Sequence, residues 1–315
     1  MPVIKIRDIA YGRLRAPDLD LMEEFLTNFG MVKVERTPRA LYMRGSDPAH
    51  HIHVTEKGEP GLLAFAYEAA SADDLQRLAR EPGASAVETM DEPGGGKRVR
   101  IREPNGYEIE VVHGIAALPP ITIAPRPLNT GTAPLNRAGT LMRVRRGPSQ
   151  VKRIAHGVLC SPDVRRTVAW FRDTLGMIQS DDLYAGSRDN LIGSFNRADC
   201  GEDYVDHHVF FCLKHGTAGL NHLSFEVQDV DDVFVGHEHL KTLGKYRHMW
   251  GIGRHLLGSQ IFDYWLDPWG QMHEHWTDSD RLNARSGSHE MPVEQGFVSQ
   301  WGEAAPPRVQ AQVSP

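Results

Sequence analysis

The sequence of 315 residues has only three cysteines, no long apolar run and no concentrated block of basic residues. The cysteines, Cys160, Cys200 and Cys212, form neither a CxxC pair nor a disulfide framework, which favours a reducing, cytoplasmic setting. A membrane span needs about 20 consecutive apolar residues, and no stretch approaches that length. The first residues also lack the layout of a signal peptide, so we expect no membrane association.

The charge balance excludes a further class of partner. Lys and Arg number 35 against 41 Asp and Glu, which gives a net charge of −6. Nucleic acid and anionic membranes are therefore not expected as partners. The unusual number is 16 histidines, which favours a metal site.

The chain contains an internal duplication, which determines its architecture. Three pairs of segments align: 9–18 with 154–163, 61–68 with 219–226, and 103–110 with 267–274. Each half begins with a strand and an amphipathic helix, continues with strands, and then repeats that order. The last pair contains an acidic-Pro-x-Gly sequence before its final strand. This sequence predicts a turn, because proline presets φ and glycine allows positive φ.

The duplication predicts two domains, 1–116 and 150–279, of which only the second is expected to bind a metal. A proline-rich linker, 117–149, should be exposed with little regular structure. The tail, 280–315, is rich in Pro, Gly, Ser and Gln, and we expect it to be disordered or to wrap a neighbouring molecule.

Helices are predicted at four places, each after a residue that can cap its first turn. The predicted helices are 19–29, 72–80, 164–175 and 230–243, with Asp18, Ser71, Asp163 and Asp229 as their N-caps.

The two copies differ at the positions that matter for chemistry. His156 aligns with Tyr11 and His222 with Ala64, whereas Glu274 aligns with another glutamate, Glu110. Only the C-terminal half therefore has two imidazoles and a carboxylate on three separate strands. This ligand set leaves open positions on a metal and is used in non-haem Fe(II) oxygen chemistry. Glu110, without histidine partners, is expected to be an ordinary carboxylate.

The βαβββ repeat, with a histidine near the start of each of two units and a glutamate after a D-P-x-G turn, resembles the vicinal oxygen chelate superfamily. Within it, the chain is similar to two-domain extradiol ring-cleaving dioxygenases of the dihydroxybiphenyl and catechol type. The resemblance covers about 1–278 and is most specific over 206–274. It implies an α+β fold in which each domain has paired βαβββ units forming a curved mixed sheet around a cavity.

The resemblance also implies roles for individual residues. Fe(II), with Mn(II) as an alternative, would be bound by His156, His222 and Glu274. His208 aligns with an acid/base histidine, and the adjacent His207 is its rival for that role.

Two further residues correspond to family positions near the substrate, His255 in a G-R-H segment and Tyr264 ten residues before the glutamate ligand. Some relatives have Asn-Asp after G-R-H, where this chain has Leu257 and Gly258, so those contacts do not carry over. Trp250, Trp265 and Trp269 are candidate pocket walls, although burial alone also explains them.

The implied reaction cleaves a substituted catechol or trihydroxylated aromatic ring, for example a trihydroxytoluene, beside its two hydroxyls. Both atoms of dioxygen are inserted, as in aromatic degradation, and relatives assemble into homo-oligomers. One alternative is a glyoxalase-like isomerase or epimerase, which typically takes ligands from four units. Another is a non-catalytic small-molecule-binding protein of the same fold, which generally lacks the metal trio.

The remaining histidines are expected to have no role in the metal site. Those at positions 50, 51 and 53 should lie on the surface or on a strand face, and those at 237 and 239 should be solvated. His273 and His275 should point away from the face of Glu274, because side chains alternate along a strand.

Overall fold

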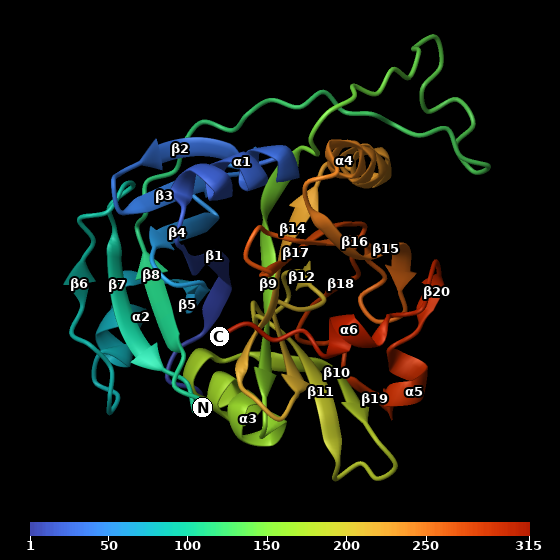
Figure 1. Ribbon diagram of the computed structural model, residues 1–315. Helices are drawn as coiled ribbons and strands as arrows, with labels where there is room; N and C mark the ends of the chain where they lie inside the picture. The colour runs from blue at the N-terminus through green and yellow to red at the C-terminus, as the bar shows by residue number, and fades with distance from the viewer.

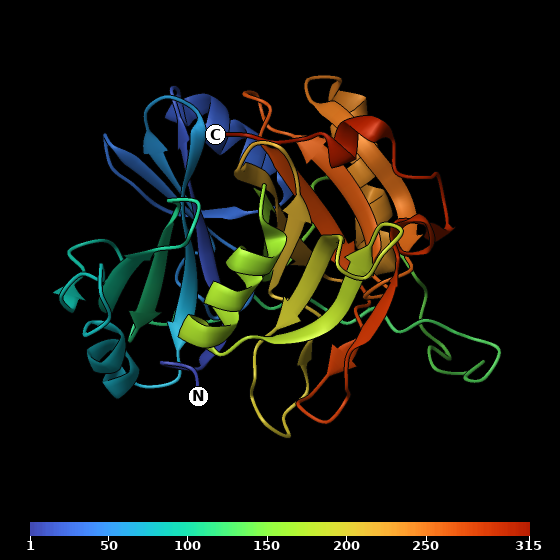
Figure 2. The ribbon, with the colours of Figure 1, turned by 90° about the horizontal axis from the view of Figure 1, so that it is seen from below.

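The computed structural model describes residues 1–315 and has a two-domain α+β fold with two large mixed sheets. The N-terminal sheet and the C-terminal sheet lie side by side, as two views at right angles show (Figures 1 and 2). This is the fold class that the duplication and the resemblance predicted. No helix has both the length and the apolar composition that crossing a membrane would require.

The N-terminal sheet has eight strands in the order β2-β3-β4-β1-β5-β8-β7-β6. The long central strands β1 and β5 pair antiparallel, and each begins one βαβββ unit. The elements are β1 (Ile6–Ala16), α1 (Leu19–Phe29), β2 (Val32–Arg36), β3 (Ala40–Arg44), β4 (His53–Lys57), β5 (Gly61–Ala69), α2 (Ala72–Leu78), β6 (Glu88–Thr89), β7 (Lys97–Arg102) and β8 (Glu108–His113).

The C-terminal sheet repeats this plan with ten strands, in the order β19-β10-β11-β13-β9-β14-β17-β16-β15-β20. Its central pair is β9 and β14, the counterparts of β1 and β5. The elements are β9 (Val151–Ser161), α3 (Val164–Leu175), β10 (Ile178–Tyr184), β11 (Leu191–Arg197), β12 (Val205–Asp206), β13 (Phe210–Lys214), β14 (Gly219–Val227), α4 (Val230–Leu243), β15 (Arg247–His255), β16 (Ile261–Leu266) and β17 (Met272–Thr277).

All four long helices begin at their predicted caps. The side chains of Asp18, Ser71, Asp163 and Asp229 each accept a hydrogen bond from a backbone N–H of the first turn. Such a bond satisfies one of the unpaired donors at a helix start. Three of the helices end where predicted; α2 ends at Leu78, two residues early.

The two halves pack through duplicated positions. Gly12 of β1 lies against Leu223 of β14, and its counterpart Gly157 of β9 lies against Phe65 of β5. A Cβ atom would come within 2.4 Å of Leu223 at the first glycine and within 2.9 Å of Phe65 at the second. Glycine at both positions therefore lets these side chains of the opposite half pack directly on the central strands, and the two halves share one core.

The linker is exposed and has no helix or strand, as expected; it crosses α1 and α4 before it loops away from the body (Figure 1). The tail is ordered and packs on its own chain, and the alternative that it wraps a neighbouring molecule stays a prediction. It forms β18 (Arg281–Leu282), β19 (His289–Pro292), α5 (Val293–Gly296), β20 (Ser299–Trp301) and α6 (Pro307–Gln310). β19 pairs with β10 and β20 with β15, so the tail covers both edges of the C-terminal sheet. Unpaired edges expose backbone donors and acceptors, which gives the tail its binding surface.

Candidate metal centre and its cavity

Three adjacent strands of the C-terminal sheet position the predicted trio. His156 is on β9, His222 on β14 and Glu274 on β17. In the pairing of these strands, Ser224 of β14 lies opposite both His156 and Glu274. The register of the sheet therefore brings together three residues that are more than fifty positions apart in the chain.

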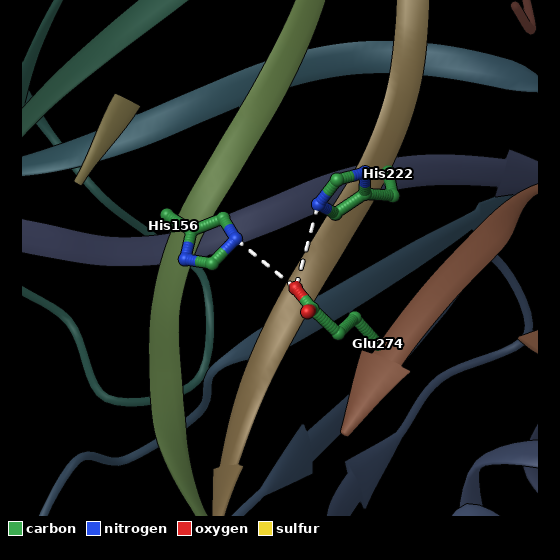
Figure 3. A group of neighbouring side chains, drawn as sticks. All are labelled: His156, His222 and Glu274. Carbon is green, nitrogen blue, oxygen red and sulfur yellow. Dashed lines mark ion pairs between the residues drawn. The ribbon is translucent and has the colours of Figure 1, made fainter. Parts of the chain in front are cut away.

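The imidazoles of His156 and His222 both point at one carboxylate oxygen of Glu274 (Figure 3). Nε2 of His156 lies 3.1 Å from Oε2 of Glu274, and Nε2 of His222 lies 3.4 Å from it. One ligand atom from each residue falls within 4.8 Å of the other two. Two ligands at right angles, with metal bonds of about 2.1 Å, lie about 3 Å apart. The trio therefore fits a single divalent metal.

The protonation states also suit a metal. Burial lowers the pKa of His156, which keeps its imidazole neutral. Burial opposes ionisation of Glu274, but the adjacent imidazoles of His156 and His222 hold the pKa of its carboxyl well below the usual range. Nε2 of His222 is buried and has no well-aligned hydrogen-bond partner, which is costly unless a cation accepts its lone pair.

Neighbouring side chains fix the orientation of the trio. Ser224 donates a hydrogen bond to Oε2 of Glu274 at 2.5 Å. Nδ1 of His222 lies 2.7 Å from Oδ1 of Asn221, and the amide of Asn221 donates to the carbonyls of Val309 and Gln312. Because the amide nitrogen of Asn221 is used by those carbonyls, its oxygen must accept from Nδ1–H of His222. That tautomer leaves the lone pair of His222 on Nε2.

His207 and His208 form a chain of hydrogen bonds beside the trio. Nε2 of His207 lies 2.6 Å from Oδ2 of Asp181, and Nδ1 of His207 lies 3.0 Å from Nδ1 of His208. The ring of His208 packs 4.1 Å from the ring of His156. Burial and the adjacent histidines, His156 first, lower the pKa of His208 well below its usual range, so it is neutral at pH 7.

His255 and Tyr264 lie on the opposite side of Glu274. Nε2 of His255 is 2.9 Å from the hydroxyl of Tyr264 and 3.4 Å from Oε1 of Glu274. Burial and the nearby Glu274 raise the pKa of Tyr264 well above its usual value, so its hydroxyl keeps its proton. These two residues place hydrogen-bonding groups around the metal centre.

Beside the trio lies a cavity that is partly open to solvent, and His156 and His222 are on its wall. Its wall contains no Asp, Glu, Lys or Arg. The lining residues are His156, Val158, Phe195, His208, Phe211, Leu213, Asn221, His222, Trp250, His255, Leu257, Gln260, Tyr264, Gly296, Phe297, Val298, Ala305, Val309 and Gln310. His208 is among them and His207 is not. Of the three candidate tryptophans, only Trp250 lines the cavity.

Sequence reasoning missed two groups of residues at this site. Asn221 and Ser224 replace Leu63 and Ala66 of the first copy, so the comparison that found the ligands could also have found them. The six tail residues of the wall gave no such signal, because the tail has no counterpart in the repeat.

The expectations for the other histidines were right in part. His273 and His275 do face away from the trio; Nε2 of His273 lies 3.2 Å from Nε2 of His53 in the N-terminal half. His53 lies on strand β4, as one of the two alternatives predicted, and is buried; His51, just before that strand, is buried as well. His237 contacts the buried carboxylate of Asp263 instead of being solvated.

Comparisons with known proteins agree with this geometry. The Glyoxalase/Bleomycin resistance protein/Dioxygenase superfamily matches residues 153–274. The chain belongs to this superfamily and, within it, to the two-domain extradiol ring-cleaving dioxygenases.

Two curated relatives support the assignment to the extradiol ring-cleaving dioxygenases. Metapyrocatechase 2 of Cupriavidus necator is 30% identical over 305 residues, which are 96% of this chain and 90% of that protein. Biphenyl-2,3-diol 1,2-dioxygenase of Paraburkholderia xenovorans is 24% identical over 278 residues, covering 85% of this chain and 86% of the relative.

Solved structures share the fold at lower identity. Homoprotocatechuate 2,3-dioxygenase from Brevibacterium fuscum, in complex with 3,4-dihydroxyphenylacetate, has a TM-score of 0.81 and 19% identity, covering 99% of this chain and 94% of that one. The Mn(II)-bound glyoxalase from Novosphingobium aromaticivorans has a TM-score of 0.79 and 23% identity, covering 99% and 95%.

Proposed function

We propose that this protein is an Fe(II)-dependent dioxygenase that cleaves catechols or trihydroxylated aromatics with uncharged, apolar substituents. The observation that carries the proposal is the His156, His222 and Glu274 trio beside a cavity without charged walls. Mn(II) is the alternative metal, because two imidazoles and a carboxylate suit both ions and ligand type alone does not separate them.

The trio would hold the metal on one face. When bound, such a metal lowers the pKa of coordinated oxygen ligands and leaves sites for catechol oxygens and dioxygen. The chain's own part is to keep the imidazole of His156 neutral and the carboxylate of Glu274 ionised, and to leave Nε2 of His222 free to bind the metal. The amide of Asn221 and the hydroxyl of Ser224 hold two of the ligands in place.

A proton from the substrate needs an acceptor, and the hydrogen bonds that join Asp181, His207 and His208 leave one nitrogen of His208 free to accept it. If Nε2–H of His207 donates to Asp181, Nδ1 of His207 can only accept, so Nδ1–H of His208 donates to it. Nε2 of His208 then carries the lone pair. His208 is thus a neutral base on the cavity wall, and His207 supports it as a positioning residue.

His255 and the protonated Tyr264 would hydrogen-bond the catechol oxygens and orient the ring. Their mutual contact of 2.9 Å places both groups beside Oε1 of Glu274. Orientation of the ring relative to the other reactant is a large part of what such a site contributes.

The wall limits the substituents of the ring. A carboxylate in this cavity would lose its hydration without gaining a cationic partner, which is costly. Alkyl and aryl groups would instead contact Phe195, Phe211, Phe297 and Val309. Alkylcatechols, dihydroxybiphenyl and trihydroxytoluene fit this description, and 3,4-dihydroxyphenylacetate does not.

The test is anaerobic reconstitution with Fe(II) or Mn(II), followed by air and a panel of these compounds. Dioxygen uptake and absorbance of a yellow ring-opened product would be followed together. We expect metal-dependent uptake with the apolar catechols, none in His222→Ala, and normal uptake in the surface control His215→Ala.

The outcomes separate the alternatives. Tight metal binding without uptake for any catechol would overturn the dioxygenase in favour of an isomerase or epimerase. Absence of metal binding would favour a small-molecule-binding protein. We also propose that the protein forms a homo-oligomer. Light scattering of the purified protein tests this.

A further inference from the structure

A second cluster of metal-ligating side chains lies on the face of the sheet opposite the cavity. Tyr264 of β16 is paired with Glu274 of β17 and faces the cavity, so the preceding Asp263 faces the other way. Helix α4 covers that face, and it brings His237 to Asp263. His248, on β15, completes the cluster.

The cluster has the same geometry as the trio in the cavity. Nδ1 of His237 lies 3.1 Å and Nε2 of His248 lies 2.8 Å from Oδ1 of Asp263. One ligand atom from each residue falls within 4.8 Å of the other two. Two imidazole nitrogens thus lie beside one carboxylate oxygen, and Nδ1 of His237 is also 3.2 Å from the other oxygen, Oδ2. Ligand atoms of a tetrahedral ion with bonds of about 2.1 Å are about 3.4 Å apart, so the nitrogens need to move outward by only a few tenths of an ångström to bind one.

The hydrogen bond from Trp265 goes to the oxygen of Asp263 that is not placed between the two histidines. Nε1–H of Trp265 donates to the other oxygen, Oδ2 of Asp263, at 2.6 Å. The Asp263 side chain is fully buried, whereas the His237 and His248 side chains are 16% and 30% exposed. Water can therefore reach the histidine side of the cluster and supply a fourth ligand. A buried carboxylate held by an outer hydrogen bond, with imidazoles at its free oxygen, is a typical arrangement around zinc.

We propose that His237, His248 and Asp263 form a second metal site, which binds Zn²⁺ and is separate from the catalytic centre. Two imidazoles and a carboxylate are zinc ligands, and a tetrahedral ion accepts three protein ligands and one water. Because the ligands come from α4, β15 and β16, the ion ties the helix to the outer strands of the C-terminal sheet. Zinc here stabilises the folded state, since the ligands are not preassembled in the unfolded chain.

The experiment must count ions separately at the two sites. Chelator-treated protein carrying Glu274→Ala, which disables the trio in the cavity, is titrated with Zn²⁺ by calorimetry and by competition with a chromogenic chelator. We expect one equivalent of zinc to bind and the melting temperature to rise. Adding His237→Ala or His248→Ala removes that equivalent and the rise in melting temperature.

A matched control uses the same helix. His239 is two residues from His237 on α4 and hydrogen-bonds Asn28 instead of the cluster. Glu274→Ala with His239→Ala should still bind one zinc ion. Circular dichroism establishes that each variant is folded, and His248→Gln replaces His248→Ala if the latter is not.

Two results would overturn the proposal. One is that the Glu274→Ala protein binds no zinc, or binds it only with a dissociation constant in the millimolar range. The other is that the equivalent persists unchanged in both His237 and His248 variants. In either case the cluster is a set of hydrogen bonds around Asp263. Dioxygen uptake by the wild-type protein is a separate measurement, and neither result bears on it.

Discussion

The hydroxyl of Tyr11 donates a hydrogen bond to Oε2 of Glu110 at 2.5 Å in the N-terminal sheet. These two residues occupy the positions that His156 and Glu274 hold in the C-terminal sheet. Glu110 is not the ordinary carboxylate that the sequence suggested, because it is buried and lies 3.3 Å from the guanidinium groups of both Arg13 and Arg98. The first copy therefore neutralises its glutamate with arginines, where the second has the geometry for a metal.

We predict that Glu110→Ala destabilises the fold by about 3–5 kcal/mol, because it removes the most deeply buried carboxylate beside Arg13 and Arg98 and leaves these arginines only partners that are 15–40% exposed. The matched control is Glu56→Ala. Glu56 also pairs with Arg13, but its side chain is 40% exposed, so its loss should cost about 1 kcal/mol or less. Urea unfolding measures both. Equal losses in the two variants would contradict the assigned role of Glu110.

Asn221→Leu restores the residue found at this position in the first copy. It removes the acceptor that fixes the tautomer of His222, and we expect the affinity for Fe(II) to fall about 10–100-fold, as for other outer partners of metal ligands. Metal content after dialysis against graded chelator measures this affinity. An unchanged affinity, in a variant with wild-type circular dichroism, would show that Asn221 does not orient the ligand.

His208→Gln should lower kcat by about 10²–10⁴-fold, the range for loss of a positioned acid/base group. Metal content and the KM for the catechol should change little, because His208 is not one of the ligands. His207→Gln should have a smaller effect and shift the pH profile of kcat, since His207 acts through the tautomer of His208. A larger effect at His207 than at His208 would reverse the two roles.

Phe297→Ala should lower kcat/KM about 10-fold for apolar-substituted catechols, since a lost apolar contact in such a pocket is worth about 1–3 kcal/mol. Catechol itself, which has no substituent to contact that wall, should be affected less. Leu135→Ala, at an exposed linker position, is the control. Equal losses for substituted and unsubstituted catechol would show that the tail does not contact the substituent.

The buried His51 should make the fold sensitive to mild acid. Burial, then the nearby His50 and Arg13, lowers the pKa of His51 to about 3. An unfolded histidine has a pKa of about 6.5, so between these values the unfolded chain binds the proton and the folded chain does not. Stability is therefore fully present above pH 6.5 and falls as the pH decreases, by up to about 1.4 kcal/mol per pH unit from this group.

His51→Phe tests this contribution. It keeps an aromatic ring against Tyr11 and Tyr42 and removes the titration. Urea unfolding between pH 7.5 and 5 should show a shallower loss of stability than in the wild type, while the control His215→Gln, a half-buried histidine outside this cluster, should match the wild type. A slope identical to the wild type would assign the acid sensitivity to other groups.

Much of the fold followed from local signals. Helix starts were predictable from Asp18, Ser71, Asp163 and Asp229, because a cap acts on the backbone within three residues of itself. The strand around Glu274 followed from its turn and its apolar pattern. The two histidines of the candidate trio came from places where the two copies differ, and Glu274 from a place where they agree, since a duplicated register shows which residues must share a face.

The sequence by itself determined the duplication, the order of elements, and the histidines and glutamate offered to a metal. Only the tertiary structure decided what closes the cavity and what supports its ligands. The tail reaches Asn221 from about ninety residues away, and α4 brings His237 to Asp263 across a helix–sheet interface. Such contacts depend on the packing of whole elements, and no short-range pattern in the chain encodes the angle at which a helix meets a sheet.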